Sequence, residues 1–157
     1  MNIGIIVHSQ TGSTFAVATR LQEALSADGH TVSLERVRAS GPMRPRAKDV
    51  PLENRPAVDA YDALVFGAPV WGGMPASPMT SYLEGVPSLQ GKQVACLMTH
   101  FFPAGWGGKQ AMSRMEAICT SKGATVCASG SVSWLCLLSR KRRIAELIDD
   151  LVDCFKE

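Results

Sequence analysis

The sequence lacks several features that would assign it to other classes of protein. It has no apolar run near the ~18 residues that a membrane-spanning helix needs, so we expect no membrane span. Its first residues carry no basic segment ahead of an apolar one, so we expect no signal peptide. Its five cysteines are an odd number without Cys-x-x-Cys spacing, which argues against a disulfide framework and against a zinc site. We therefore expect reduced cysteines, packed as small apolar side chains in a cytoplasmic protein, and no metal.

Length and composition indicate one globular domain over residues 1–157. Hydrophobic residues make up 46% of the chain and charged residues 19%, which is ordinary for a globular protein. A chain of this length buries roughly 70% of the surface that its unfolded form exposes. The net charge of +2 is too small for a nucleic-acid-binding protein, and the aromatic residues do not interleave with the basic ones. We expect no nucleic-acid partner.

The most informative segment is Ser9–Thr14, with the sequence Ser-Gln-Thr-Gly-Ser-Thr. It follows Ile3–Val7, an apolar run that indicates a buried strand, and a helical pattern begins at Ser13. A turn at this point directs backbone N–H groups toward one place, where the helix dipole also favours an anion. The segment has neither the lysine of a triphosphate loop nor the Gly-x-Gly-x-x-Gly of a dinucleotide loop.

A lone phosphate monoester, held by hydroxyls and backbone amides, fits this segment best. FMN carries such a group. The alternative is a Ser/Thr-rich helix cap with no ligand, although a single hydroxyl would suffice for a cap.

Strand and helix patterns alternate along the chain, which predicts an α/β fold with a parallel sheet covered on both faces. Residues 38–60 contain four prolines, so we expect an extended connection there with at most one short helix. The expected strands are 3–7, 31–37, 63–67, 93–98 and 125–131, and the expected helices are 13–28, 77–84, 108–122 and 144–155.

The motif Ser9-x-Thr11-Gly12-x-Thr14 resembles the phosphate loop of flavodoxins and related FMN oxidoreductases. Two more matches follow expected strands, at Ala68–Gly73 and at Thr99–Gly108. The resemblance extends over essentially the whole chain. It implies a flavodoxin-like three-layer sandwich, with a five-stranded parallel sheet of order 2-1-3-4-5. In that order, ligands bind at the carboxyl ends of the strands.

The resemblance also implies which residues bind FMN. Trp71 would stack on the flavin ring, unless it is buried in the core or at a dimer contact. Phe101, Phe102 and Trp106 are candidates for the opposite wall. His100 would donate a hydrogen bond to flavin or substrate, or be merely solvated. The full expected set is Ser9, Gln10, Thr11, Gly12, Ser13, Thr14, Ala68, Pro69, Val70, Trp71, Gly72, Gly73, Thr99, His100, Phe101, Phe102, Trp106, Gly107 and Gly108.

The chain departs from electron-carrier flavodoxins in its charges. Neither 68–75 nor 99–109 contains a carboxylate, whereas the carriers keep acids near the ring, which lowers the potential of the flavin. We expect a higher potential here, which suits an enzyme that takes hydride from NAD(P)H or reduces quinones. Because the flavin supplies the redox chemistry, we expect no catalytic side chain.

Two alternatives remain open. The first is a non-catalytic FMN electron shuttle that docks on an acidic partner protein through basic surfaces such as Arg140–Arg143. Four cations at a helix start oppose the helix dipole, so we expect them in a solvated loop before the last helix. The second is a low-molecular-weight phosphatase or arsenate reductase, because Cys136 to Arg142 matches Cys-x5-Arg. Residues 38–60 and the aromatic residues of 99–108 are candidate contacts of a homo-oligomer.

Overall fold

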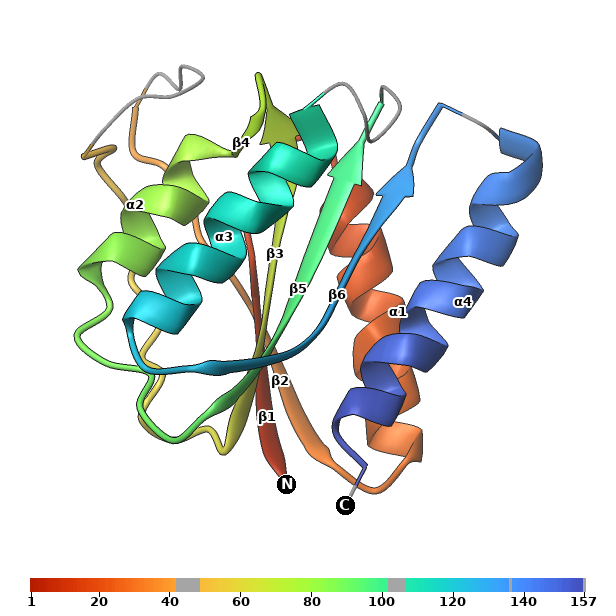
Figure 1. The fold of residues 1–157 in the computed structure, drawn as a ribbon, viewed down its shortest axis with the longest axis horizontal. Helices are drawn as coiled ribbons and strands as arrows, with labels where there is room; N and C mark the ends of the chain where they lie inside the picture. The colour runs from red at the N-terminus through yellow and green to blue at the C-terminus, as the bar shows by residue number, and fades with distance from the viewer. Residues whose placement is uncertain (42–48, 102–106, 136, 157) are drawn as a thin grey trace.

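The computed structural model describes residues 1–41, 49–101, 107–135 and 137–156. Strands and helices alternate along most of the chain, as the sequence patterns predict (Figure 1). The elements are β1 (Asn2–Val7), α1 (Ser13–Ala27), β2 (Thr31–Arg36), β3 (Ala63–Trp71), β4 (Met74–Pro75), α2 (Ser77–Gly85), β5 (Gln93–His100), α3 (Lys109–Ser121), β6 (Thr125–Ser133) and α4 (Leu137–Cys154).

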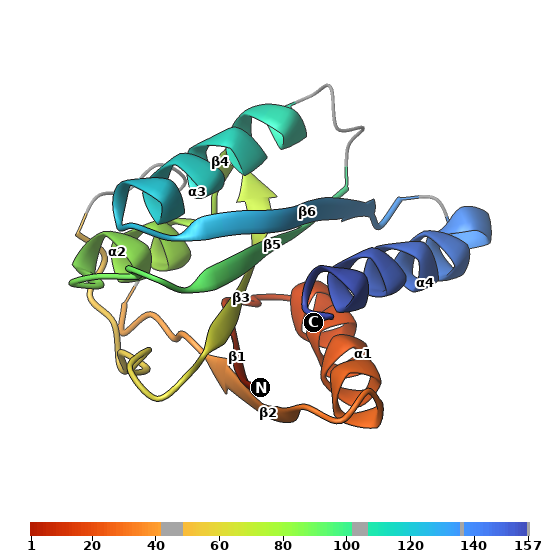
Figure 2. The same ribbon diagram turned by 60° about the horizontal axis from the view of Figure 1, so that its bottom comes forward.

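The sheet has the order β2-β1-β3-β5-β6, and these five strands are parallel. The predicted order 2-1-3-4-5 is confirmed, because β5 and β6 are the fourth and fifth predicted strands. The short β4, which was not predicted, pairs antiparallel with the end of β3. Helices α1 and α4 cover one face of the sheet, and α2 and α3 cover the other (Figures 1 and 2). The fold is therefore the expected three-layer α/β sandwich.

Alternate residues of each central strand supply the two halves of the core. In β1, Ile3 and Ile5 pack with α1 and α4, whereas Ile6 packs with α2 and α3. In β3, Val65 and Phe66 divide between the two faces in the same way. A strand that is buried on both faces has an uninterrupted apolar sequence, and for this reason the central strands were predictable.

Several boundaries differ from the predictions, and β6 for example ends at Ser133 rather than at residue 131. Strand β3 runs to Trp71 rather than Gly67, because its last residues pair with β4. Strand β5 runs to His100 rather than Met98, because β6 continues beside it. Helix α4 begins at Leu137, so the basic residues 140–143 lie in its first two turns and not in a preceding loop. In the described part of 38–60 there is no helix, and one antiparallel bridge joins Ala39 to Leu52.

The expectation that all the cysteines are reduced is wrong for two of them. A disulfide joins Cys127 of β6 to Cys154 at the end of α4. The two residues are 27 positions apart, and no local spacing rule relates them. Cys96 and Cys119 are free and buried, as expected of small apolar side chains. Cys136 lies outside the described residues.

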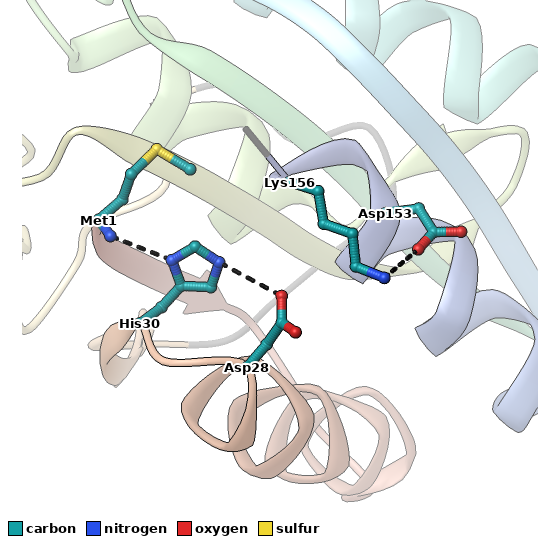
Figure 3. Close-up of polar contacts among 5 residues, drawn as sticks. All are labelled: Met1, Asp28, His30, Asp153 and Lys156. Atoms are coloured by element: carbon teal, nitrogen blue, oxygen red, sulfur yellow. Dashed lines mark hydrogen bonds and ion pairs between the residues drawn. The ribbon is translucent and has the colours of Figure 1, made fainter.

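Polar contacts join side chains near the amino ends of the strands (Figure 3). The amino group of Met1 donates to Nδ1 of His30 at 3.0 Å, and Nε2 of the same ring lies 3.8 Å from a carboxylate oxygen of Asp28. Nearby, Lys156 pairs with Asp153 at 3.0 Å. Both chain ends lie at this edge (Figure 1). None of the helices in the described part of the chain is long and apolar enough to cross a membrane.

Candidate functional site

The carboxyl ends of the parallel strands surround a cavity of about 100 Å³. All three predicted segments contribute to its lining, and a residue after β6, which no motif marks, completes it. The lining residues are Gln10, Thr11, Ser13, Pro69, Val70, Trp71, Thr99, His100, Phe101 and Trp134. Of the other predicted residues, Ser9, Gly12, Thr14, Ala68, Gly72, Gly73, Gly107 and Gly108 lie in the same segments without lining the cavity, and Phe102 and Trp106 lie outside the described residues.

The first segment, Ser9–Thr14, forms a turn that hydrogen bonds to the Ser9 side chain hold in place. Gly12, at φ +95°, is the N-cap residue of α1, a backbone conformation that favours glycine. The Ser9 hydroxyl accepts hydrogen bonds from the backbone N–H of Gly12 at 3.1 Å and of Phe15 at 3.2 Å. Ser9 therefore caps the helix. The N–H groups of Ser13 and Thr14 have no acceptor within the helix, so they are available to an anion.

Two hydroxyls of this segment stand at the cavity, and a third points inward. Thr11 Oγ1 and Ser13 Oγ lie 3.5 Å apart, and both residues line the cavity. The Thr14 side chain is instead buried, and its hydroxyl forms a 2.7 Å hydrogen bond with that of Thr99 in β5. This bond ties the start of α1 to the end of β5, beneath the turn. Thr14 therefore positions the loop through its side chain.

Arg36, at the end of β2, lies beside the same turn. Its guanidinium donates to the carbonyl oxygen of Ser9 at 2.9 Å and stands over the Phe15 ring at 4.6 Å. A fixed cation at this place raises the electrostatic potential of the turn, which favours an anionic ligand. Arg36 belongs to no recognisable sequence motif. It reaches the turn because β2 pairs with β1 in the sheet.

The second segment is a tight hairpin. Gly72 and Gly73, at φ +57° and +78°, join β3 to β4. Two consecutive residues at positive φ form the turn that fits the twist of a hairpin, and glycine adopts this conformation without strain. A Cβ on Gly107 would lie 2.9 Å from the Gly73 Cα, so the second and third segments are in backbone contact there.

A buried histidine supports the aromatic residue of the hairpin. Trp71 packs edge-to-face against the His8 ring, with the ring centroids 5.7 Å apart. His8 is 4% exposed, and its Nδ1–H donates to the carbonyl oxygen of Val37 at 2.9 Å. Burial lowers the pKa of His8; the bond to Val37 opposes this shift, and the charge of Arg36 adds to it. Nε2 of this neutral ring is an acceptor without a hydrogen-bond partner among the described residues.

The third segment begins inside β5. His100 Nε2 lies 3.3 Å from the Ser131 hydroxyl, and the His100 carbonyl accepts from the N–H of Trp134 at 2.6 Å. Trp134 reaches the cavity in this way, and Arg140 stacks on its ring at 4.5 Å. For Trp134, the available sequence signal was a tryptophan three residues after the expected strand 125–131, at the carboxyl edge. For His8, the signal was a polar residue between an apolar strand and the Ser-x-Thr-Gly motif.

The residues fit the phosphate and ring of FMN. The turn supplies N–H groups at a helix start, two hydroxyls and a nearby guanidinium, which suit a phosphate monoester. The half-buried Trp71 supplies an aromatic surface at the cavity, and the cavity lining includes no carboxylate. The part of the chain that the structure describes contains no group of three or more metal-ligating side chains.

The phosphatase alternative has no loop to support it. A phosphate-binding Cys-x5-Arg loop must wrap its ligand with backbone N–H groups. Here residues 137–142 are helical, so their backbone groups serve the helix. Arg142 is exposed and faces Glu146 at 3.8 Å.

Comparisons with known proteins agree with this fold. The sequence model of the NADPH-dependent FMN reductase family matches residues 1–134. A search of curated proteins found no match. Similar solved structures include a cysteine-to-serine mutant of flavodoxin from Pseudomonas aeruginosa (TM-score 0.71, 15% identity, 100% of both chains). Others are flavodoxin 1 from Bacillus cereus (TM-score 0.68, 14% identity, 99% of this chain and 100% of that one) and a flavoprotein in complex with FMN from Lactobacillus acidophilus (TM-score 0.62, 22% identity, 93% and 97%).

Proposed function

Because the chain belongs to the NADPH-dependent FMN reductase family, we propose that it takes electrons from NADPH or NADH and passes them to a small acceptor such as a quinone. FMN is its cofactor, as the family implies. The similar flavoprotein from Lactobacillus acidophilus is in complex with FMN, which supports the same flavin here.

The turn at the start of α1 is the observation that carries the proposal. Gly12 is held at positive φ, and the Ser9 hydroxyl is occupied by the N–H groups of Gly12 and Phe15. The N–H groups of Ser13 and Thr14, with the hydroxyls of Thr11 and Ser13, are then arranged to hold the FMN phosphate. Hydrogen bonds to a charged group of this kind are about twice as strong as neutral ones.

The remaining residues would orient the ring. Bound FMN supplies the hydride and electron chemistry, so the chain's part is to bind, orient and tune it. Trp71, supported from behind by His8, offers an aromatic wall. The Gly72–Gly73 turn lets backbone approach the ring without a side chain in the way. Thr99 is held by Thr14, so the floor of the cavity is fixed relative to the phosphate turn.

The charges around the cavity support an enzyme over a low-potential carrier. The cavity lining has no carboxylate to disfavour an anionic reduced flavin, and Arg36 lies behind the phosphate turn. We therefore expect a flavin potential above that of carrier flavodoxins, which are acidic near the ring. A redox titration that gives a potential as low as theirs would contradict this expectation.

The first test is ligand binding. The visible spectrum of the purified protein is recorded, and the apoprotein is then titrated with FMN and with riboflavin, which lacks the phosphate. We expect tight FMN binding and much weaker riboflavin binding. Equal affinities would show that the turn at Ser9–Thr14 does not hold a phosphate, and no binding of either would overturn the proposal.

The second test is turnover. The FMN-loaded protein is mixed with NADPH or NADH and a quinone, and oxidation of the nicotinamide is followed. Steady turnover by the protein alone supports the reductase. Turnover only after a separate reductase is added would favour the electron-shuttle function instead.

A further inference from the structure

The first two turns of α4 carry charges that oppose folding. Arg140–Arg143 lie near the helix start, where the dipole disfavours cations, and the acidic Glu146, Asp149, Asp150 and Asp153 follow toward its end. Arg142 and Arg143 both pair with Glu146, at 3.8 and 3.1 Å, but these contacts are exposed and add little stability. Neither the helix dipole nor these exposed ion pairs gives the four basic charges a stabilising role.

The same region holds every large apolar side chain that is exposed in the described part of the chain. Phe101 is 55% exposed, Leu135 65%, Leu137 70% and Leu138 99%. Phe101 is joined to the end of β6 through a Ser133 hydroxyl that donates to its carbonyl oxygen. The four side chains therefore gather at the carboxyl ends of β5 and β6 and at the start of α4.

Helix geometry explains why Leu137 is mostly exposed. The buried stripe of α4 is formed by Ile144, Leu147, Ile148 and Leu151. Leu137 lies seven residues before Ile144, so it continues the same stripe by two turns. Figure 2 shows the start of α4 projecting beyond β6, with no other element beside it. Leu137 thus lies on the line of this stripe, beyond Arg140 and Lys141 and past the body of the protein.

We call Leu135, Leu137, Leu138 and Arg140–Arg143 the α4 tip, and we propose that it docks the protein on a bilayer surface that contains anionic lipids. Arg140, Lys141 and Arg142 lie three or four residues after Leu137 or Leu138, so these side chains share one side of the helix. Arginine and lysine stems lie along apolar surface while their charged groups reach anionic headgroups. Exposed leucines beside clustered cations are the composition of interfacial helices.

Other occupants fit these features less well. Two copies in a symmetric contact would bring the two basic clusters together, which is unfavourable. An acidic protein would match the charge but would also need a groove for leucines that project from the end of a helix. A bilayer requires no such groove.

Docking in this way would bring the cavity rim close to the lipid. Trp134, which lines the cavity, is held between the His100 carbonyl and the Arg140 guanidinium of the tip. The proposal does not rest on the proposed function, because it concerns binding to lipid and not catalysis.

The test is flotation of the FMN-loaded protein with vesicles of phosphatidylcholine alone and of phosphatidylcholine mixed with phosphatidylglycerol. We expect binding to the anionic vesicles only, and weaker binding at high salt. Leu137→Ser with Leu138→Ser should lower the partition coefficient about tenfold or more for each leucine. Lys141→Gln should lower it about fivefold. All three side chains are exposed, so these variants should keep the flavin spectrum and the far-UV circular dichroism of the wild type.

A matched control removes the same kind of charge elsewhere. Arg20→Gln on α1 and Arg114→Gln on α3 are exposed and distant from the tip in sequence, and each should leave vesicle binding nearly unchanged. The proposal is overturned if the wild type does not bind anionic vesicles, or if the double leucine variant binds them equally well. A dimer in sedimentation that the leucine changes dissociate would overturn it in favour of a second copy. An acidic redox protein that binds the tip when vesicles do not would overturn it in favour of a protein partner.

Discussion

Polar groups have different partners at the two ends of the parallel strands, which we call the amino edge and the carboxyl edge of the sheet. At the amino edge the Met1 amine pairs with His30 (Figure 3). The Asn2 N–H there donates to a carboxylate oxygen of Asp62 at 2.8 Å. At the carboxyl edge, α1 begins with N–H groups that have no acceptor within the helix. A ring Nε2 without a hydrogen-bond partner among the described residues occurs at both edges, in His8 and in His30. The difference between the two edges is therefore the start of α1, whose N–H groups are left for a ligand at the carboxyl edge. Changes at the two edges should therefore have different effects.

The largest expected effect is on flavin affinity at the carboxyl edge. In the double variant Thr11→Val with Ser13→Ala, two hydroxyls that face the cavity are lost. Each hydrogen bond to a charged group contributes about 1.5–3 kcal/mol, so FMN affinity should fall on the order of 100-fold or more. Riboflavin affinity should not change, because riboflavin has no phosphate. Fluorescence titration of the apoprotein measures both.

A matched change at the amino edge serves as the control. Thr31→Val removes an exposed hydroxyl at the start of β2, far from the cavity. It should leave the dissociation constants of both flavins as they are in the wild type. If Thr31→Val weakened FMN binding as strongly as the double variant, the phosphate would not be held at the turn.

The next effect compares two glycines at positive φ. Gly107→Ala at the carboxyl edge combines a left-handed backbone at φ +106° with a Cβ only 2.9 Å from Gly73, so it should cost about 2–5 kcal/mol. Gly29→Ala at the amino edge, at φ +93° with open space around it, should cost only about 1–2 kcal/mol. Urea unfolding measures both costs. Flavin affinity should fall for Gly107→Ala alone, and equal behaviour of the two variants would contradict this account.

The sequence predicted the frame of the carboxyl edge well. Ile3–Val7 is an uninterrupted apolar run because both faces of β1 are buried, and the helical start at Ser13 follows from local pattern. Nine of the ten residues that line the cavity belong to the three predicted segments. Each of these features depends on residues that are close together in the sequence. It can therefore be recognised within a single segment.

The features that were not predicted depend on contacts between distant segments. His8 follows β1, Arg36 ends β2 and Trp134 follows β6. They join the site because the sheet topology places these three strand ends around it. The Cys127–Cys154 bond has the same origin. The start of α4 was predicted wrongly because the helix dipole was given too much weight. Leucine, arginine and lysine are strong helix formers, and each unfavourable charge costs only about 0.3–1 kcal/mol.

A smaller effect concerns pH and the buried His8. Because burial lowers its pKa below the ordinary 6.5, the unfolded chain binds more protons than the folded one between 6.5 and the lower, folded value. The free energy of unfolding should therefore be greatest above about pH 6.5 and fall as the pH falls through this window, by at most about 1.4 kcal/mol per pH unit.

The variant His8→Asn removes this titration while keeping a side-chain donor for the Val37 carbonyl. Its unfolding free energy, measured by urea denaturation across this pH range, should have a flatter dependence than that of the wild type. An unchanged dependence would mean that His8 does not titrate differently in the folded chain. The wild type with bound FMN is a useful second case, because it shows whether a ligand changes the environment of His8.

The smallest effect should be at the amino edge. Lys156 and Asp153 form an ion pair at 3.0 Å in which both side chains are more than half exposed, and the bond to Asp153 raises the pKa of Lys156 (Figure 3). Exposed pairs of this kind contribute little, because water and salt screen them. Lys156→Met should leave the thermal midpoint and the FMN dissociation constant within experimental error of the wild type at any salt concentration. A clear loss of flavin affinity would show that the two edges are coupled through the sheet, and the distinction between a self-paired edge and a ligand edge would then fail.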